Sequence, residues 1–126
     1  MTFFSENEYA TYHIQDGTLH INYKDGIKID LTAAVRIVED RLRLQEGLSY
    51  NVICDIRGLR EVDKSARDYL ALEGSILVKS VAYIIETNVS KALSEFYLRI
   101  SKPPIPSRTF TDLAAARAFL NKGPEQ

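Results

Sequence analysis

Two alternating runs joined by an Asp-Gly dipeptide limit how the N-terminal part of this chain can fold. Asp16-Gly17 separates Ala10–Gln15 from Thr18–Tyr23, and Asp-Gly favours the two-residue type I′ loop of an antiparallel hairpin. In that register one face is wholly apolar, and it carries Ala10, Tyr12, Ile14, Leu19, Ile21 and Tyr23. The other face is polar, and it carries Thr11, His13, Gln15, Thr18, His20 and Asn22. Because a slip of one residue would mix the two sets, we predict a β-hairpin in this register.

The rest of the chain alternates between short apolar runs and helical repeats. Tyr50–Ile56 and Ser80–Glu86 are typical of strands that are buried on both faces, and Ser107–Phe110 is predicted as a short edge strand. Four helices are expected. The first runs from an N-cap at Asp30 or Thr32 to about Glu46, and the second from an N-cap at Ser65 to near Gly74. The third runs from Asn88 to about Ser101, and the fourth begins at a cap formed by Thr111. This order predicts an α/β fold in which an N-terminal antiparallel hairpin is followed by β-α crossovers in a mixed sheet.

The first helix shows the clearest helical spacing. Its inward stripe is predicted to be Leu31, Ala34, Val35, Val38 and Leu42. Glu39 and Arg43 are spaced for an i,i+4 ion pair on the opposite side. Gly47 is placed to end this helix.

The charge of the chain is close to neutral. Its 126 residues carry 16 Lys and Arg against 17 Asp and Glu, a net charge of -1. A nucleic-acid-binding domain would need a basic excess for phosphate contacts, so we expect no nucleic-acid partner. The length suits one domain, which we place at residues 9–122, between a flexible N-terminal lead at 1–8 and a C-terminal tail at 123–126.

The chain has few features that would direct it out of a reducing compartment. Cys54 is the single cysteine, so no intrachain disulfide can form. The N-terminal residues lack the basic and apolar regions of a secretory signal, and no apolar stretch reaches the length of a membrane span. We therefore expect a cytoplasmic protein without a membrane span.

One segment resembles a known family of regulatory domains. The stretch from Ile53 to Ala66 (ICDIRGLREVDKSA) resembles the STAS-like domains, which include the anti-sigma-factor antagonists. In their pattern a buried strand and a short loop precede an Asp-Ser-Ser-Gly step that opens a helix. Ile56, Leu59, Val62 and Asp63 match this pattern without a gap. The resemblance implies a STAS-like fold.

The same segment departs from the family at the residue that is phosphorylated. Lys64 stands where the resemblance places the phosphoacceptor serine, while Ser65 matches the second serine and Ala66 the glycine. A lysine cannot accept the phosphate, so we do not expect a phosphorylation switch. STAS-like sheets are also similar in outline to the lipid-binding CRAL-TRIO fold, which implies a small apolar ligand between helix and sheet as a second possibility.

Polar residues gather after the strand Tyr50–Ile56. Ligands and partners commonly meet parallel sheets at the carboxyl ends of their strands, and the crossover from Arg57 to Arg67 carries a local charge of +2. Its candidate partner-binding residues are Arg57, Asp63, Lys64, Ser65 and Arg67. The alternative interpretation is a helix cap in a solvated loop, where these charges only keep the loop in water.

The sequence offers no catalytic or metal-binding set. Cys54 lies inside an apolar strand, and Ser65 has no histidine in its segment to act as a base. His13 and His20 face each other in the predicted hairpin, where they form either half of a metal site or an exposed polar pair. We expect no catalytic residues, no metal and no cofactor.

These observations favour a non-enzymatic regulatory or protein-interaction domain that docks through the loop and helix start after the central strand. The alternative is a small-molecule or lipid-binding domain with an apolar pocket. A homodimer is a further possibility, because Tyr97 or Leu98 could be exposed on the helix that Asn88 opens.

Overall fold

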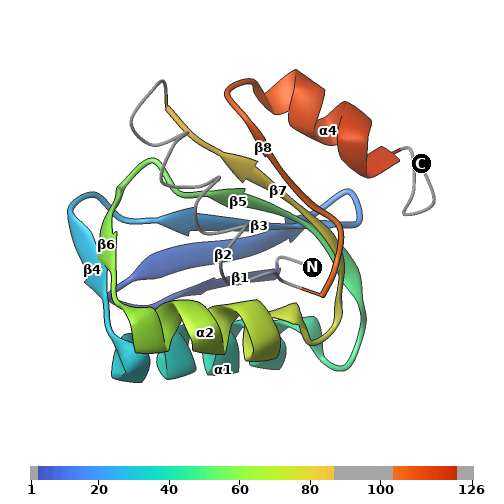
Figure 1. Ribbon diagram of the computed structural model, residues 1–126. Helices are drawn as coiled ribbons and strands as arrows, with labels where there is room; N and C mark the ends of the chain where they lie inside the picture. The colour runs from blue at the N-terminus through green and yellow to red at the C-terminus, as the bar shows by residue number, and fades with distance from the viewer. Residues whose placement is uncertain (1–2, 87–103, 122–126) are drawn as a thin grey trace.

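The computed structural model describes residues 3–86 and 104–121, and these form a mixed sheet with helices on both faces (Figure 1). The strands are β1 (Phe3–Glu6), β2 (Ala10–Gln15), β3 (Thr18–Tyr23), β4 (Ile27–Ile29), β5 (Tyr50–Asp55), β6 (Leu59–Val62), β7 (Val78–Ile84) and β8 (Ser107–Phe110). The helices are α1 (Leu31–Gln45), α2 (Lys64–Leu72), the short 3₁₀ helix η1 (Glu73–Ser75) and α4 (Leu113–Asn121). The helix expected after Asn88, including Tyr97 and Leu98, lies outside the described residues, as does the tail 123–126.

The main sheet has six strands in the order β1-β2-β3-β5-β7-β8. Strands β1, β2 and β3 are antiparallel, and the pairs from β3 to β8 are parallel. The hairpin register is confirmed, since Tyr12 lies opposite Ile21 and His13 opposite His20. The predicted α/β class, an antiparallel N-terminal part followed by crossovers, is therefore confirmed.

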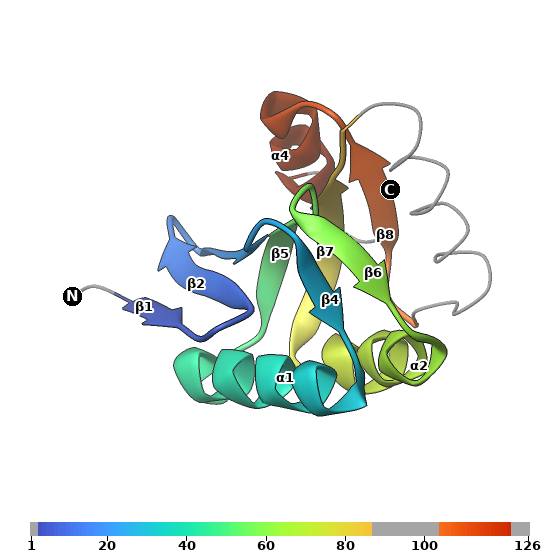
Figure 2. The same cartoon turned by 90° about the vertical axis from the view of Figure 1, so that its left-hand side faces the viewer.

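Helices cover the two faces of the sheet unequally. Figure 2 shows α1 and α2 side by side below the sheet and α4 above it. Val52 and Cys54 of β5 face the α1 and α2 side, whereas Ile53 between them belongs to the smaller cluster with Ala116 of α4. Because successive side chains of a strand point to opposite faces, one apolar strand supplies both clusters.

The structure shows which of the candidate residues cap the N-termini of α1 and α2. Asp30, one of two candidates, caps α1 by accepting a hydrogen bond from the Ala33 N–H at 2.8 Å. The predicted Ser65 cap of α2 is wrong, because Asp63 accepts from the Ala66 N–H at 2.9 Å and the helix begins at Lys64. Asp63, two positions before Ser65, is the cap because its carboxylate reaches the N–H of Ala66, the third residue of the helix.

The start of α4 corrects a second expected cap. Asp112 lies directly before Leu113, the first residue of α4, and its Oδ1 accepts from the Ala114 N–H at 3.1 Å. Thr111, which we expected as the cap, is one residue too early for that contact. Leu113 itself is 44% exposed.

The inward face of α1 is rotated from the predicted stripe. Leu31 is 45% exposed, whereas Ile37 is buried. The i,i+4 pair of Glu39 and Arg43 does not form, because Arg43 Nη1 binds the Asp40 carboxylate at 2.9 Å instead. Asp40 lies one residue nearer to Arg43 along the helix, and it is itself buried against the β1–β2 turn.

Two short strand pairings were not predicted. Residues 1–8 were expected to be a flexible lead, yet Phe3–Glu6 form β1 and pair antiparallel with β2. Within the expected loop Arg57–Arg67, Leu59–Val62 form β6, which pairs in parallel with β4. Both strands have at most four residues, so neither is long enough to give a clear alternation in the sequence.

Candidate functional site

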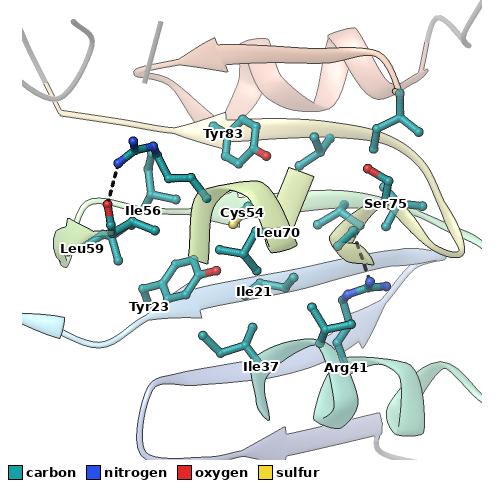
Figure 3. Close-up of a pocket in the computed structure, with 18 of the residues that line it drawn as sticks. Ile21, Tyr23, Ile37, Arg41, Cys54, Ile56, Leu59, Leu70, Ser75 and Tyr83 are labelled. Atoms are coloured by element: carbon teal, nitrogen blue, oxygen red, sulfur yellow. Dashed lines mark hydrogen bonds between the residues drawn. The ribbon is translucent and has the colours of Figure 1, made fainter. Parts of the chain in front are cut away.

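An apolar cavity lies between the sheet and the helices α1 and α2 (Figure 3). Its volume is about 380 Å³, within the range of small-molecule sites. The described residues that line it are Ile21, Tyr23, Ile37, Val38, Arg41, Val52, Cys54, Ile56, Leu59, Arg60, Glu61, Val62, Arg67, Leu70, Gly74, Ser75, Val78, Val81, Tyr83 and Ile105. Most of these side chains are aliphatic or aromatic, so an occupant would meet mainly apolar atoms.

Opposite walls of the cavity come from distant parts of the chain. In Figure 3 Leu70 of α2 points toward Ile21 of β3 and Cys54 of β5, and Ile37 of α1 closes the lower side. Cys54 is 6% exposed, and burial raises the pKa of its thiol to about 12. The thiol therefore stays protonated at neutral pH and serves as an apolar wall atom, because only the thiolate is a good nucleophile.

Gly58 sets the position of the rim that β6 forms. Its carbonyl oxygen accepts hydrogen bonds from the backbone N–H groups of Gly26 at 2.8 Å and Ile27 at 3.4 Å. The contact ties the loop before β4 to the loop before β6. Leu59 and Val62, at the two ends of β6, line the cavity from this tethered strand.

Arg41 of α1 is a buried cation at the cavity wall. It is 2% exposed, and its guanidinium donates to the carbonyl oxygens of Gly74 at 3.2 Å and Ile76 at 3.0 Å and to the Gln45 side chain. Burial lowers its pKa, but an arginine remains charged in proteins. Within the described residues no carboxylate forms an ion pair with it.

The sequence did carry a signal for Arg41 that our prediction missed. Arg41 follows Ile37 by four residues and Val38 by three, so it continues the buried face of α1. An arginine on an apolar helical stripe needs acceptors or a counter-charge. The acceptors come from the chain after α2, which the helix pattern alone cannot show.

Most of the predicted docking residues bind neighbouring residues outside the predicted set. Arg57 is exposed and binds the Asp55 carboxylate, with Nη2 to Oδ2 at 2.6 Å. Lys64 pairs with Asp68 at 2.8 Å. Asp63 caps α2, as described above, and Ser65 is exposed in its first turn. In the described parts of the chain, no side-chain hydrogen bond or ion pair joins one of these docking residues to another.

Arg67 differs from the other docking residues because it also lines the cavity. It is half-buried, and its Nη1 donates to the Val62 carbonyl oxygen at 2.9 Å. Its Nε is buried without a hydrogen-bond partner. Since a buried donor without a partner is unfavourable, Arg67 has hydrogen-bonding capacity that the described residues leave unused.

The two histidines of the hairpin stack on each other. The rings of His13 and His20 are parallel, with centroids 4.5 Å apart and an interplanar angle of 2°. In the described residues, no group of three His, Cys, Asp or Glu side chains is arranged to hold a metal ion. Burial, followed by the nearby charge of His13, lowers the pKa of His20.

This lowered pKa predicts a pH dependence of stability. The pKa of His20 is about 6.5 in the unfolded chain and lower in the folded protein. As the pH falls, the unfolded state therefore binds a proton before the folded state does. We expect the melting temperature to fall as the pH drops from 7.5 to 5.5. Thermal unfolding of the His20→Gln variant should show a flatter profile over this range, and an equal slope in both proteins would contradict the assignment to His20.

Comparison with solved structures defines the class of fold. The chain is similar to an uncharacterized protein from the DUF3478 family of Shewanella loihica PV-4, described as having a SpoIIAA-like fold. The TM-score is 0.62 at 15% sequence identity, and the match covers 95% of this chain and 92% of the other. At that identity the likeness establishes the fold alone: the chain has a SpoIIAA-like α/β fold, as the STAS-like resemblance implied.

The family follows from a match along most of the chain. The model of a domain of unknown function, DUF7793, matches residues 12–123, and the chain belongs to this family. The comparison with curated proteins gives no match. In the described parts of the chain, every helix is too short or too polar to cross a membrane.

Proposed function

We propose that this protein is a non-enzymatic small-molecule-binding domain whose ligand is mainly apolar. The observation that carries this proposal is the cavity of about 380 Å³, with walls of aliphatic and aromatic side chains. Well-packed interiors hold few voids larger than a water molecule. A cavity of this size therefore favours a site for an apolar molecule over a defect in the core.

The test compares dye binding by the wild-type protein with dye binding by a variant whose cavity is filled. Leu70 points into the cavity from α2, so Leu70→Trp should occupy much of its volume. We expect the neutral dye Nile red to fluoresce with the wild-type protein, and this signal to fall at least about fivefold in Leu70→Trp. The exposed Leu72→Trp on the same helix is the matched control. Equal dye binding by all three proteins would reject the cavity as the site.

Native mass spectrometry gives a second test of the same proposal. Protein purified under mild conditions is expected to carry a bound small molecule, which Leu70→Trp should lack. Wild-type protein that neither carries a ligand nor binds Nile red would mean that the chain itself fills the cavity.

A second candidate function is protein docking through the loop after β5. It is supported by exposure: the Lys64 side chain is 80% exposed and that of Arg57 is 52% exposed, and Ser65 lies exposed between Asp63 and Arg67. Docking at this surface would proceed without phosphoryl transfer, because Lys64 occupies the position that the STAS-like resemblance gives to the phosphoacceptor. Among the described residues, the Ser65 hydroxyl has no base within hydrogen-bond distance.

The docking candidate is tested by reversing the exposed charges. Lys64→Glu combined with Arg57→Glu should abolish capture of a protein partner from the native cell, while the melting temperature changes by less than about 3 °C. Lys79→Glu, which reverses an exposed charge on β7 that forms no ion pair with the described residues, is the control. Partner capture that survives the double substitution would exclude this loop as the docking surface.

A further inference from the structure

We propose that the ligand of the cavity is an apolar carboxylic acid, and that Arg67 binds its carboxylate. This inference rests on the proposed ligand-binding function and specifies the chemistry of the ligand. The described lining contains three arginines, Arg41, Arg60 and Arg67, against one carboxylate, Glu61. The cavity therefore combines apolar walls with a positive charge excess.

The arginines of the cavity lack a counter-charge among the described residues. No carboxylate in the described part of the chain forms an ion pair with Arg41, Arg60 or Arg67. Arg60 and Glu61 are both exposed, so water weakens the effect of both on the cavity. The two inner arginines, Arg41 and Arg67, are therefore the charges that act on an occupant. A positive charge beside apolar walls attracts an anion more strongly than the same charge in water does. An anionic group on the ligand would supply the counter-charge that the described residues do not.

The hydrogen bonds of the two inner arginines decide which one binds the carboxylate. Arg41 already donates to Gly74, Ile76 and Gln45, and it is almost wholly buried, so it holds η1 and the following turn in place. The Arg67 guanidinium has five donors, and among the described residues it makes one hydrogen bond, to the Val62 carbonyl oxygen. It is also half-buried, so a ligand can reach its guanidinium.

The chemistry of the guanidinium selects a carboxylate as the partner. Its planar N–H groups match the two oxygens of a carboxylate, and such pairs are stronger than hydrogen bonds between neutral groups. The tail of the acid would extend from Arg67 along the apolar wall that includes Leu70, Ile21 and Cys54. The site would thus prefer a long-chain acid over the alcohol of equal length.

The experiment measures displacement of Nile red by decanoic acid and by 1-decanol at pH 8, where the acid is ionised. We expect decanoate to displace the dye from wild-type protein at a concentration at least about tenfold lower than decanol. In Arg67→Gln this preference should shrink to less than about threefold. Lys64→Gln, which removes a charge from the same helix outside the cavity, should keep it.

The outcomes separate this inference from the proposed function. Dye displacement by both probes at equal concentrations would overturn the carboxylate inference and leave an apolar site standing. Failure of wild-type protein to bind the dye at all would reject the site itself. A preference that persists in Arg67→Gln would overturn the role of Arg67. Should that variant not fold, Arg67→Lys is used, which keeps the charge but loses the planar fork and should give an intermediate preference.

Discussion

Replacing Gly58 with alanine is expected to lower the free energy of unfolding by about 2 to 3 kcal/mol, because the new methyl group overlaps the backbone of the β3–β4 turn. A Cβ atom at Gly58 would lie 2.6 Å from the Lys24 carbonyl oxygen and 2.8 Å from that of Tyr23. Real Cβ atoms do not approach backbone so closely, so one of the two loops must shift. Chemical denaturation, with the free energy extrapolated to water, measures the loss.

The substitution should also affect the candidate site. A shift of Gly58 weakens the hydrogen bonds that its carbonyl oxygen accepts from Gly26 and Ile27, and these hold β6 at the cavity rim. We therefore expect weaker Nile red binding by Gly58→Ala under conditions where the protein remains folded. The rim would be shown to be independent of this contact if dye binding were unchanged.

Gly74→Ala is the matched control for Gly58→Ala. A Cβ atom at Gly74 would lie 3.7 Å from the Leu70 Cβ, an ordinary contact. Its effect on stability should stay within about 0.5 kcal/mol. Similar losses in both variants would mean that the cost arises from replacing any glycine, and that the close approach at Gly58 is not its cause.

Local patterns were sufficient to predict most of the fold. The hairpin register followed from Asp16-Gly17 and from the separation of apolar and polar faces, and both are properties of neighbouring residues. The Asp30 cap was one of two local candidates. The α2 cap was missed for a local reason as well: Ser65 and Asp63 both suit an N-cap, and backbone geometry selected the carboxylate.

The cavity could not be predicted in the same way. Leu70 meets Ile21 only because α2 crosses the face of the sheet that β3 supplies, and helical spacing gives the inward side of α2 without giving its distance from the sheet. The sequence predicts Arg67 as a partner-binding residue of the docking loop, with a solvated loop as the alternative. The structure places it at the cavity wall, in the first turn of α2, where its guanidinium reaches back to the Val62 carbonyl oxygen of β6.

Replacing Asp40 with alanine is expected to lower the free energy of unfolding by about 2 to 3 kcal/mol, since it removes hydrogen bonds to a buried charged group. The Asp40 carboxylate accepts from Asn7 Nδ2 at 2.8 Å, Arg36 Nε at 2.9 Å and Arg43 Nη1 at 2.9 Å. Asn7 Nδ2 also donates to the Tyr12 hydroxyl at 2.8 Å. Asp40 thus joins α1 to the β1–β2 turn, and its loss should be measurable by chemical denaturation.

The pH dependence of this effect identifies the ionised carboxylate as its source. Burial alone would raise the pKa of Asp40, but the hydrogen bonds from Asn7 and Arg36 outweigh burial and lower it. A carboxyl whose folded pKa is lowered contributes stability above its unfolded pKa of about 3.9, and this stability is lost as the pH falls through the folded pKa. The stability difference between wild type and Asp40→Ala should therefore be full at pH 6 and shrink below pH 4.

Glu39→Ala provides the control for the loss of a carboxylate from α1. Glu39 is exposed, and it forms no ion pair with any residue that the structure describes. Its replacement should change the free energy of unfolding by less than about 0.5 kcal/mol at pH 6. Equal losses from Glu39→Ala and Asp40→Ala would trace the effect to the net charge of the helix, whereas a loss confined to Asp40→Ala assigns it to the buried contact with Asn7.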